Sequence, residues 1–278
     1  MAGVWLTDLA DVLRAAGISV IEETYVQGRY KGLSWKKVGF GGRGLVDFRF
    51  ILWHHDSSPM GDSPGALSWM KYYANDGAGT DLTPAAACWV CTGCNGAHQS
   101  GTWHIYAAGL SNRAGRGCGG WGVGQSMNNY SLGIETDHTE GEPWKGPKKE
   151  TQLASLRAGT AAIFKSYELD PTPALLFHRT WTDGGVDGVP LAAWAWQGGT
   201  RGRKTDPSGL DLAEERRIVA ALMNGTDAGR VDALRARLTS LIARRTAARK
   251  AGDTVRLEQV RTRIANIRAR IRKFTGKA

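Results

Sequence analysis

Two histidines in this sequence follow short apolar runs, at positions where buried strands would end. His54 follows the run F-I-L-W, and His178 follows the run L-L-F. Farther along, the cluster G-R-K-T-D-P-S-G at 202–209 supplies a carboxylate, Asp206. A catalytic zinc ion typically takes three imidazole or carboxylate ligands and leaves a fourth position for water. The pattern therefore predicts an open zinc site formed by His54, His178 and Asp206.

Two further side chains fit hydrolytic chemistry at such a site. Glu135 ends the apolar segment S-L-G-I-E, where a carboxylate could serve as a general base. Lys204 lies two residues before Asp206 and could stabilise negative charge on a carbonyl oxygen. A single histidine at a strand end is more often structural than a ligand, so the prediction rests on the combination.

The elements that must position these residues can be read from hydrophobic patterning and turn signals. Helices are expected at 5–17, 62–80, 150–167 and 210–223. Strands are expected at 18–22, 48–53, 85–91, 102–108 and 131–136, and in the run before His178. Strands mixed with helices, without strict alternation, predict an α/β fold: a mixed central β-sheet flanked by helices, with the zinc site at strand ends.

Composition places this chain among soluble globular proteins. Its 278 residues are 42% hydrophobic, with a mean hydropathy of −0.32. No apolar run approaches the roughly 18 residues of a membrane helix, and the N-terminus lacks the pattern of a secretory signal. We therefore expect synthesis in a cytoplasm without a signal peptide and action elsewhere only after release through the membrane.

The net charge of +10 is concentrated at one end of the chain. Residues 226–278 hold 15 Lys and Arg against 4 Asp and Glu, whereas residues 1–225 hold 21 basic and 22 acidic residues. The chain therefore divides into a nearly neutral domain at 1–225 and a basic segment at 226–278. The neutral domain does not resemble a nucleic-acid-binding surface.

The basic segment carries apolar residues at heptad spacing on both sides of Lys250-Ala251-Gly252-Asp253. This predicts a C-terminal α-helical hairpin with arginines between its apolar stripes. The hairpin could bury its leucines, with or without forming a homo-oligomer. It could also attach the protein to anionic cell-wall polymers or phospholipid surfaces. Nucleic acid is a weaker candidate, because no base-reading motif accompanies the charge.

Three cysteines, Cys88, Cys91 and Cys94, have the spacing C-x-x-C-x-x-C. With Cys118 or His98 they could hold a second, structural zinc ion. However, the first two fall in an expected strand, where alternate residues face opposite ways. We therefore expect buried free thiols rather than a metal site or a disulfide.

Five motifs together resemble the type 2 N-acetylmuramoyl-L-alanine amidases, the family that includes peptidoglycan recognition proteins and phage amidase lysozymes. They occur in the family's order and cover most of 1–223. The motifs are I-L-W-H-H-D at 51–56, A-A-G-L-S-N-R-A-G-R-G at 107–117, L-G-I-E at 132–135, F-H-R-T-W at 177–181 and G-R-K-T-D-P-S-G at 202–209.

The resemblance implies a role for each site residue. His54, rather than its neighbour His55, would bind zinc together with His178 and Asp206. Glu135 would match the glutamate that orients or deprotonates the water, and Lys204 the lysine that stabilises the carbonyl oxygen. The implied reaction is hydrolysis of the amide bond between N-acetylmuramic acid and L-alanine in bacterial peptidoglycan.

Substrate contacts are expected around this centre, at His55, Asn112 and Arg113 and at tryptophans in loops. A flat indole face can stack on a sugar ring. Arg113 stands where the family often has a histidine, and the loop between His178 and Gly202 is longer than in the simplest members. The tryptophan candidates are Trp121, Trp144, Trp181, Trp194 and Trp196.

In its motif variants and its expected synthesis without a signal peptide, the chain resembles a phage endolysin of the lysin A type, directed at actinobacterial walls. This implies a role in host cell lysis. Two other classes stay open. One is a non-catalytic peptidoglycan-binding module, although all three expected zinc ligands are present. The other is a scaffold protein built around the C-terminal segment.

Overall fold

The computed structural model describes most of the first 225 residues and part of the C-terminal segment. The described ranges are 3–25, 30–55, 86–93, 98–111, 127–138, 141, 143–178, 207–225, 238, 242, 245–246, 249–250, 252 and 254–275. The helix expected at 62–80 and the loop from 179 to 202 lie outside them.

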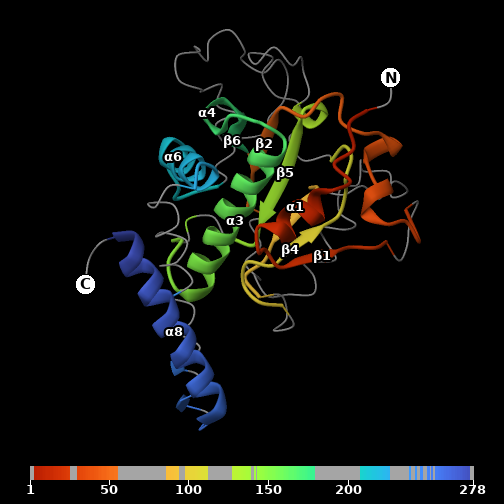
Figure 1. Ribbon diagram of the computed structural model, residues 1–278. Helices are drawn as coiled ribbons and strands as arrows, with labels where there is room; N and C mark the ends of the chain where they lie inside the picture. The colour runs from red at the N-terminus through yellow and green to blue at the C-terminus, as the bar shows by residue number, and fades with distance from the viewer. Residues whose placement is uncertain are drawn as a thin grey trace.

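Six strands form one mixed sheet in the order β1-β4-β3-β5-β2-β6 (Figure 1). Strands β3 and β4 pair antiparallel, and every other neighbouring pair is parallel. The predicted mixed sheet is thus confirmed; four strands are shorter than expected, whereas the strands at 131–136 and before His178 have the expected bounds. The strands are β1 (Val20–Glu22), β2 (Phe50–Trp53), β3 (Cys88–Val90), β4 (Trp103–Ile105), β5 (Ser131–Thr136) and β6 (Leu175–Phe177).

Helices α1 (Leu9–Ala15) and α3 (Pro147–Ser166) cross one face of the sheet, and α6 (Leu212–Met223) packs beside α3 (Figure 1). These three were predicted from periodicity, to within a few residues at most ends. The four-residue helix α4 (Pro171–Ala174) was not predicted, because two prolines within four residues are more typical of a loop. Short 3-10 turns occur at η1 (Trp35–Lys37), η2 (Phe40–Gly42) and η5 (Met127–Asn129).

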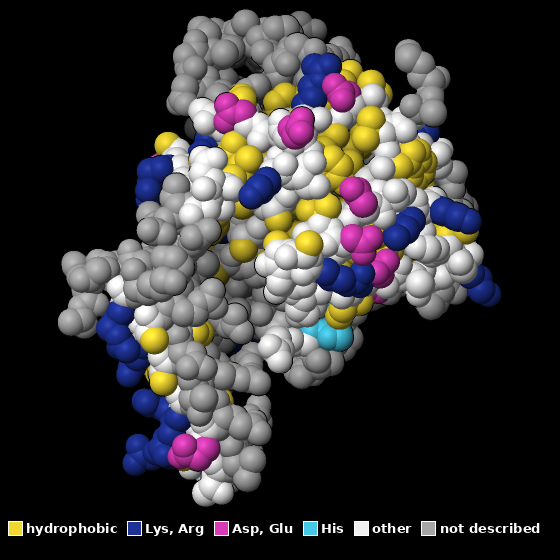
Figure 2. Space-filling model, viewed as in Figure 1, with side chains coloured by type: hydrophobic (Ala, Val, Ile, Leu, Met, Phe, Trp, Pro, Cys, Tyr) yellow, Lys and Arg dark blue, Asp and Glu magenta, His cyan; other side chains and the backbone are white. Residues whose placement is uncertain are grey.

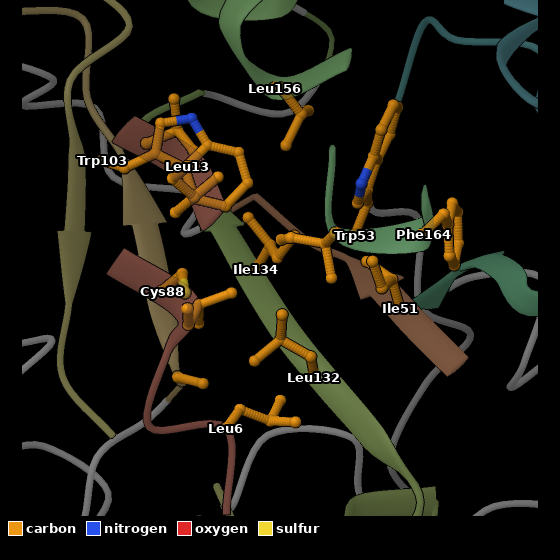
Figure 3. Close-up of a cluster of buried hydrophobic side chains, with 14 of the residues drawn as sticks. Leu6, Leu13, Ile51, Trp53, Cys88, Trp103, Leu132, Ile134, Leu156 and Phe164 are labelled. Atoms are coloured by element: carbon orange, nitrogen blue, oxygen red, sulfur yellow. The ribbon is translucent and has the colours of Figure 1, made fainter. Parts of the chain in front are cut away.

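The core lies between the sheet and α1 and α3, and it is built from alternate strand residues (Figure 3). Trp53 and Trp103 project from this face, and their indole nitrogens donate to Thr160 Oγ1 (3.0 Å) and Ser155 Oγ (3.1 Å) of α3. These bonds explain polar residues on the buried side of the helix, since a buried indole N–H needs an acceptor. The side chains on the opposite face of the sheet therefore take no part in this packing and can serve another chemical role.

Helix α3 packs closely against the sheet and α1 at Gly159. A Cβ atom there would lie 2.3 Å from a ring carbon of Trp103 and 3.0 Å from a Leu13 methyl carbon. A glycine is required for this contact, because a larger residue would push α3 away from β4.

At the C-terminal end, α8 (Thr254–Thr275) lies away from the sheet (Figure 1). Its Val260, Ile264 and Ile267 are buried in an apolar cluster that includes Leu238 and Ile242. These contacts are those expected of a helical hairpin, which stays a prediction because much of 226–253 is not described. Within the described residues, no helix combines the length and apolar character needed to cross a membrane.

Candidate active site

One row of cross-strand neighbours crosses the sheet on the face opposite α1 and α3. The pairings Trp89 with His104 and Trp89 with Glu135 belong to the ladders of β3. The ladder between β2 and β5 continues past Trp53, because the His54 N–H donates to Ile134 O (2.9 Å) and the Thr136 N–H to His54 O (3.0 Å). From β1 to β6 the row reads Ile21, His104, Trp89, Glu135, His54 and His178.

His54, Glu135 and His178 lie together at the carboxyl ends of β2, β5 and β6. The ring centroids of the two histidines are 4.4 Å apart, and Glu135 Oε1 is 3.9 Å from His54 Nδ1. All three residues are buried; Glu135 is 0% and His178 is 6% exposed. The fold thus brings together, from segments far apart in sequence, three of the residues predicted to form the site.

His55 lies on the other side of its strand from His54 and near a different histidine. Its ring centroid is 5.9 Å from that of His138, and both side chains are buried. His138 follows Asp137, whose carboxylate accepts hydrogen bonds from the backbone N–H and hydroxyl of Thr92. Asp137 therefore ties the end of β5 to the end of β3. Neither His138 nor Asp137 was predicted from the sequence.

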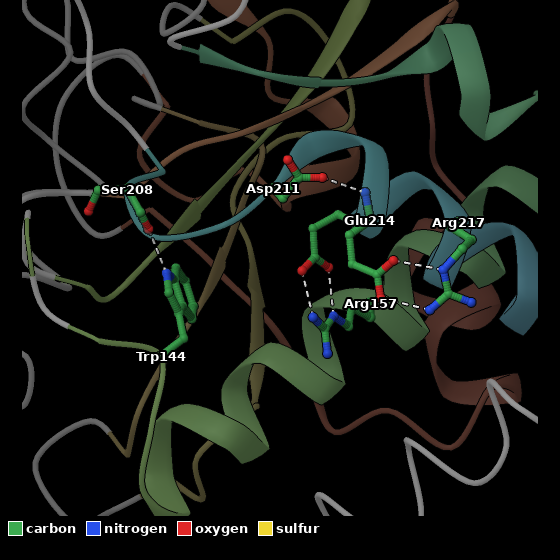
Figure 4. Close-up of polar contacts among 7 residues, drawn as sticks. Trp144, Arg157, Ser208, Asp211, Glu214 and Arg217 are labelled. Carbon is green, nitrogen blue, oxygen red and sulfur yellow. Dashed lines mark hydrogen bonds and ion pairs between the residues drawn. The ribbon is translucent and has the colours of Figure 1, made fainter.

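Trp144 connects this region to the segment that follows Asp206. Its ring stacks on His138 with centroids 3.8 Å apart and an interplanar angle of 10°. Its Nε1–H donates to Ser208 O (2.8 Å) (Figure 4). The Ser208 hydroxyl accepts from the backbone N–H of Gly141 (3.0 Å). Trp144 is only 8% exposed. The prediction of a sugar-stacking loop residue is therefore wrong at Trp144, because packing and a hydrogen bond occupy its ring.

Helix α6 fixes the other side of this region. Asp211 caps its N-terminus by accepting from the Glu214 N–H (2.8 Å), and Arg157 of α3 forms a two-pronged ion pair with Glu215 (Figure 4). The Arg216 Nε–H donates to Leu175 O (3.0 Å) in β6. These contacts hold β6, and with it His178, against the rest of the sheet.

A family model described as N-acetylmuramoyl-L-alanine amidase matches residues 46–209, more than half of the chain. The chain belongs to this family. The family predicted from the five motifs is thereby confirmed, and with it amide hydrolysis in peptidoglycan as the activity and substrate class of the family. Searches of curated proteins and of solved structures gave no match.

Several predicted site residues fall within the matched segment but outside the described residues. They include the third expected zinc ligand, Asp206, and the expected oxyanion stabiliser, Lys204. Among the residues that the structure describes, no group of three His, Cys, Asp or Glu side chains is arranged to hold a metal ion. The substrate contacts outside the described ranges are Asn112, Arg113, Trp121, Trp181, Trp194 and Trp196.

The described part of the site fits zinc in its chemistry. Two buried imidazoles 4.4 Å apart are close enough for one ion to reach a nitrogen of each, given Zn–N distances of about 2.0–2.1 Å. The buried carboxylate of Glu135 beside them can accept a proton as a general base without itself being a zinc ligand. The donor set is thus the one expected of a catalytic zinc with a third ligand from another segment.

Of the cysteines considered as zinc ligands, the structure describes Cys88 and Cys91, and these two do not face the same side of the sheet. Cys88 points into the core under α1, where burial raises the pKa of its thiol (Figure 3). Cys91 lies three residues on and faces the opposite side of the sheet, beside His104. Both are buried free thiols, as expected. A zinc ion shared by Cys88 and Cys91 is therefore excluded by the alternation of β3.

Proposed function

We propose that this chain is a zinc-dependent N-acetylmuramoyl-L-alanine amidase in which His54, His178 and Asp206 bind the metal ion. The observation that carries the proposal is the meeting of His54, His178 and Glu135 at one edge of the sheet in a member of this family. The bond hydrolysed joins the lactyl group of N-acetylmuramic acid to L-alanine.

Each residue has a defined part in that reaction. A bound zinc ion supplies a Lewis acid that polarises the amide carbonyl and lowers the pKa of water to about 7. Glu135 accepts the proton of the attacking water and later delivers a proton to the departing amine of L-alanine. Its burial in contact with His54 excludes bulk water and holds the carboxylate in one place.

Lys204 provides the remaining charge. As negative charge develops on the carbonyl oxygen, the ammonium group offers a hydrogen-bond donor that is most effective in that state. Loss of one such donor typically costs about 3 kcal/mol of transition-state stabilisation. A substrate contact at Asn112, Arg113, Trp121, Trp181 or Trp196 would add binding without altering this chemistry.

Metal removal tests the proposal and separates it from a non-catalytic peptidoglycan-binding module. Chelation of the purified protein should abolish release of peptides from peptidoglycan, and added zinc should restore it. A non-catalytic binding module would stay bound to the cell wall and release no peptides, whether or not zinc is present. Activity that persists after the metal has been removed would rule out zinc dependence.

Trp144 is expected to position the zinc ligand Asp206 through Ser208. Replacing Trp144 with phenylalanine keeps the aromatic packing on His138 but removes the donor to Ser208 O. We expect the affinity for the active-site zinc to fall by about 10–100-fold, as is typical when a residue that orients a ligand is lost. Competition with a chromogenic chelator would measure the change.

Trp35→Phe is a matched control for this variant. It removes a similar indole bond, from Trp35 Nε1 to Glu22 Oε2 (2.7 Å), on a different part of the fold. Zinc affinity should be unchanged in the control. Equal affinity in Trp144→Phe and the wild type would show that Ser208 needs no such anchor.

We also propose that the enzyme acts as a phage endolysin, made in the host cytoplasm and reaching the wall after the membrane is opened. The support is the resemblance of its motifs to phage amidase lysozymes. Expression in an actinobacterial host should leave cells intact until the membrane is permeabilised, and lysis should then follow. Two results would contradict this role: lysis of cells whose membrane has not been permeabilised, or absence of lysis after the membrane has been permeabilised.

The C-terminal segment offers an anion-binding surface to the same enzyme. Arg245, Arg249 and Arg261 line a pocket of about 450 Å³ together with Leu257, and Arg261 also pairs with Glu258. Basic side chains gather on the surface of the C-terminal segment (Figure 2). Several cations around one hollow attract phosphate-bearing polymers by charge and by two-pronged hydrogen bonds. We infer that this segment, expected to form a separate unit at 226–278, attaches the amidase to anionic cell-wall polymers.

Neutralising the pocket should weaken this attachment. The double variant Arg245→Gln, Arg249→Gln is expected to cosediment less with purified cell walls, and the difference should disappear at high salt. The variant Arg14→Gln, Arg217→Gln removes the same charge from exposed positions on the catalytic part. Equal loss of binding in both variants would show that net charge alone, rather than the pocket, retains the protein.

A further inference from the structure

The last core-facing residue of β5 is a threonine. Leu132 and Ile134 of the same strand pack in the core between the sheet and the helices (Figure 3). Thr136 follows at the same alternation, paired with Val90 of β3, and its side chain is 0% exposed. A hydroxyl group that is withdrawn from water costs free energy unless it is hydrogen-bonded. A polar residue at this position therefore needs a specific partner.

That partner is the main-chain carbonyl of His54. The Thr136 hydroxyl donates to His54 O (2.8 Å), and the Thr136 N–H donates to the same oxygen (3.0 Å). A carbonyl oxygen has two lone pairs, so this one residue can occupy both acceptor positions. The peptide that joins His54 to His55 is thus held from β5 by two hydrogen bonds.

These bonds act where the pairing between β2 and β5 ends. β2 ends one residue before His54, so the bonds to His54 are the last of this ladder among the described residues. Strand ends open more readily than strand centres, and an additional hydrogen bond opposes that opening. Because the main chain sets which face a side chain takes, the bonds also keep the His54 ring toward Glu135 and His178.

Thr136 can serve as an anchor because the residue after it is fixed by two other elements. The Asp137 carboxylate accepts from Thr92, which follows β3. The Asp137 carbonyl accepts from Lys149 Nζ (2.7 Å) and from Gln152 Nε2 (3.1 Å), both on α3. The end of β5 is thereby tied to β3 and to α3, and Thr136 extends this hold to the end of β2.

We propose that Thr136 is a positioning residue for the amidase site, whose hydroxyl holds the zinc ligand His54 in place through its main-chain carbonyl. The inference rests on the proposed function, since it takes His54 as a ligand. The Thr136 side chain faces the core, away from the side on which Glu135 and His178 lie. It therefore acts only through His54, and its loss should change zinc affinity without changing the KM for peptidoglycan.

Thr136→Val in the full chain tests the proposal. Valine keeps the branched shape but cannot donate to His54 O. Competition with a chromogenic chelator should show a zinc affinity about 3–10-fold lower, as expected from the loss of one buried hydrogen bond. Thr136→Ser keeps a hydroxyl group and should restore most of the affinity. The KM for peptidoglycan should equal that of the wild type in both variants.

Thr102→Val is the matched control. Thr102 is 2% exposed, and its hydroxyl also donates to a main-chain carbonyl, Gln99 O, at 2.8 Å. It lies beside β4 rather than β2. The control should lower the thermal stability and leave zinc affinity unchanged. An equal loss of zinc affinity in Thr102→Val, or no recovery in Thr136→Ser, would overturn the proposal.

Hydrogen exchange of the metal-free protein separates this inference from the proposed function. Thr136→Val should speed exchange of the amides of residues 54 and 136 by about 3–10-fold, because the strand end opens more often. If chelation leaves wild-type hydrolysis intact while exchange rises in the variant, zinc dependence fails and the hold of Thr136 on His54 stands. If hydrolysis depends on zinc but Thr136→Val binds zinc as tightly as the wild type, the proposed function stands and this inference is overturned.

Discussion

Replacing Glu135 with glutamine should lower the rate of amide hydrolysis by about 10²–10⁴-fold, the usual contribution of a general base. Glutamine has nearly the same shape as glutamate but cannot take a proton from water. Since the proposed ligands are His54, His178 and Asp206, zinc content should be unchanged. Alanine at this position should give the same result. The rate of amine release from purified peptidoglycan, measured together with bound zinc, tests the expectation.

Glu215→Gln is the matched control for Glu135→Gln. Glu215 is also a buried glutamate, 2% exposed, but its partner is Arg157 on α3 rather than a histidine. Its replacement should lower the thermal stability and leave turnover near that of the wild type. Full activity in Glu135→Gln would remove Glu135 from the reaction.

The adjacent histidines His54 and His55 should differ sharply when each is replaced with alanine. Successive residues of an extended chain face opposite sides. His54 faces Glu135 and His178, whereas His55 lies near His138. We expect His54→Ala to lose one zinc ion per chain and nearly all activity, and His55→Ala to keep its zinc.

Metal analysis of the two purified variants measures this difference directly. Each variant serves as the control for the other, because both remove one buried imidazole from neighbouring positions. Loss of zinc from His55→Ala but not from His54→Ala would reverse the assignment. Loss of zinc from both variants would show that zinc binding depends on the strand end as a whole and not on one imidazole ring.

Much of the fold and part of the site could be predicted from local patterns. The apolar runs before His54 and His178 indicate buried strands, and a polar residue at the end of such a run is placed at the edge of the sheet. The same reasoning predicted Glu135. The structure adds the register between β2, β5 and β6, which brings these three side chains together and depends on pairings between distant segments.

Other features could not be predicted, because they depend on contacts between segments with no shared pattern. The stacking of Trp144 on His138 depends on how the chain turns after β5, and the sequence offers only a tryptophan between two polar stretches. The contact of Cys91 with His104 depends on antiparallel pairing between β3 and β4. Cysteine spacing alone left open a second metal site that included Cys88, although buried free thiols were expected.

Mass spectrometry of peptidoglycan digested by the purified protein is the most direct test of the central claim. The account predicts peptides with a free amino group on L-alanine and intact glycan strands, provided that zinc is present. New reducing sugar ends, with the bond between N-acetylmuramic acid and L-alanine left uncut, would contradict it.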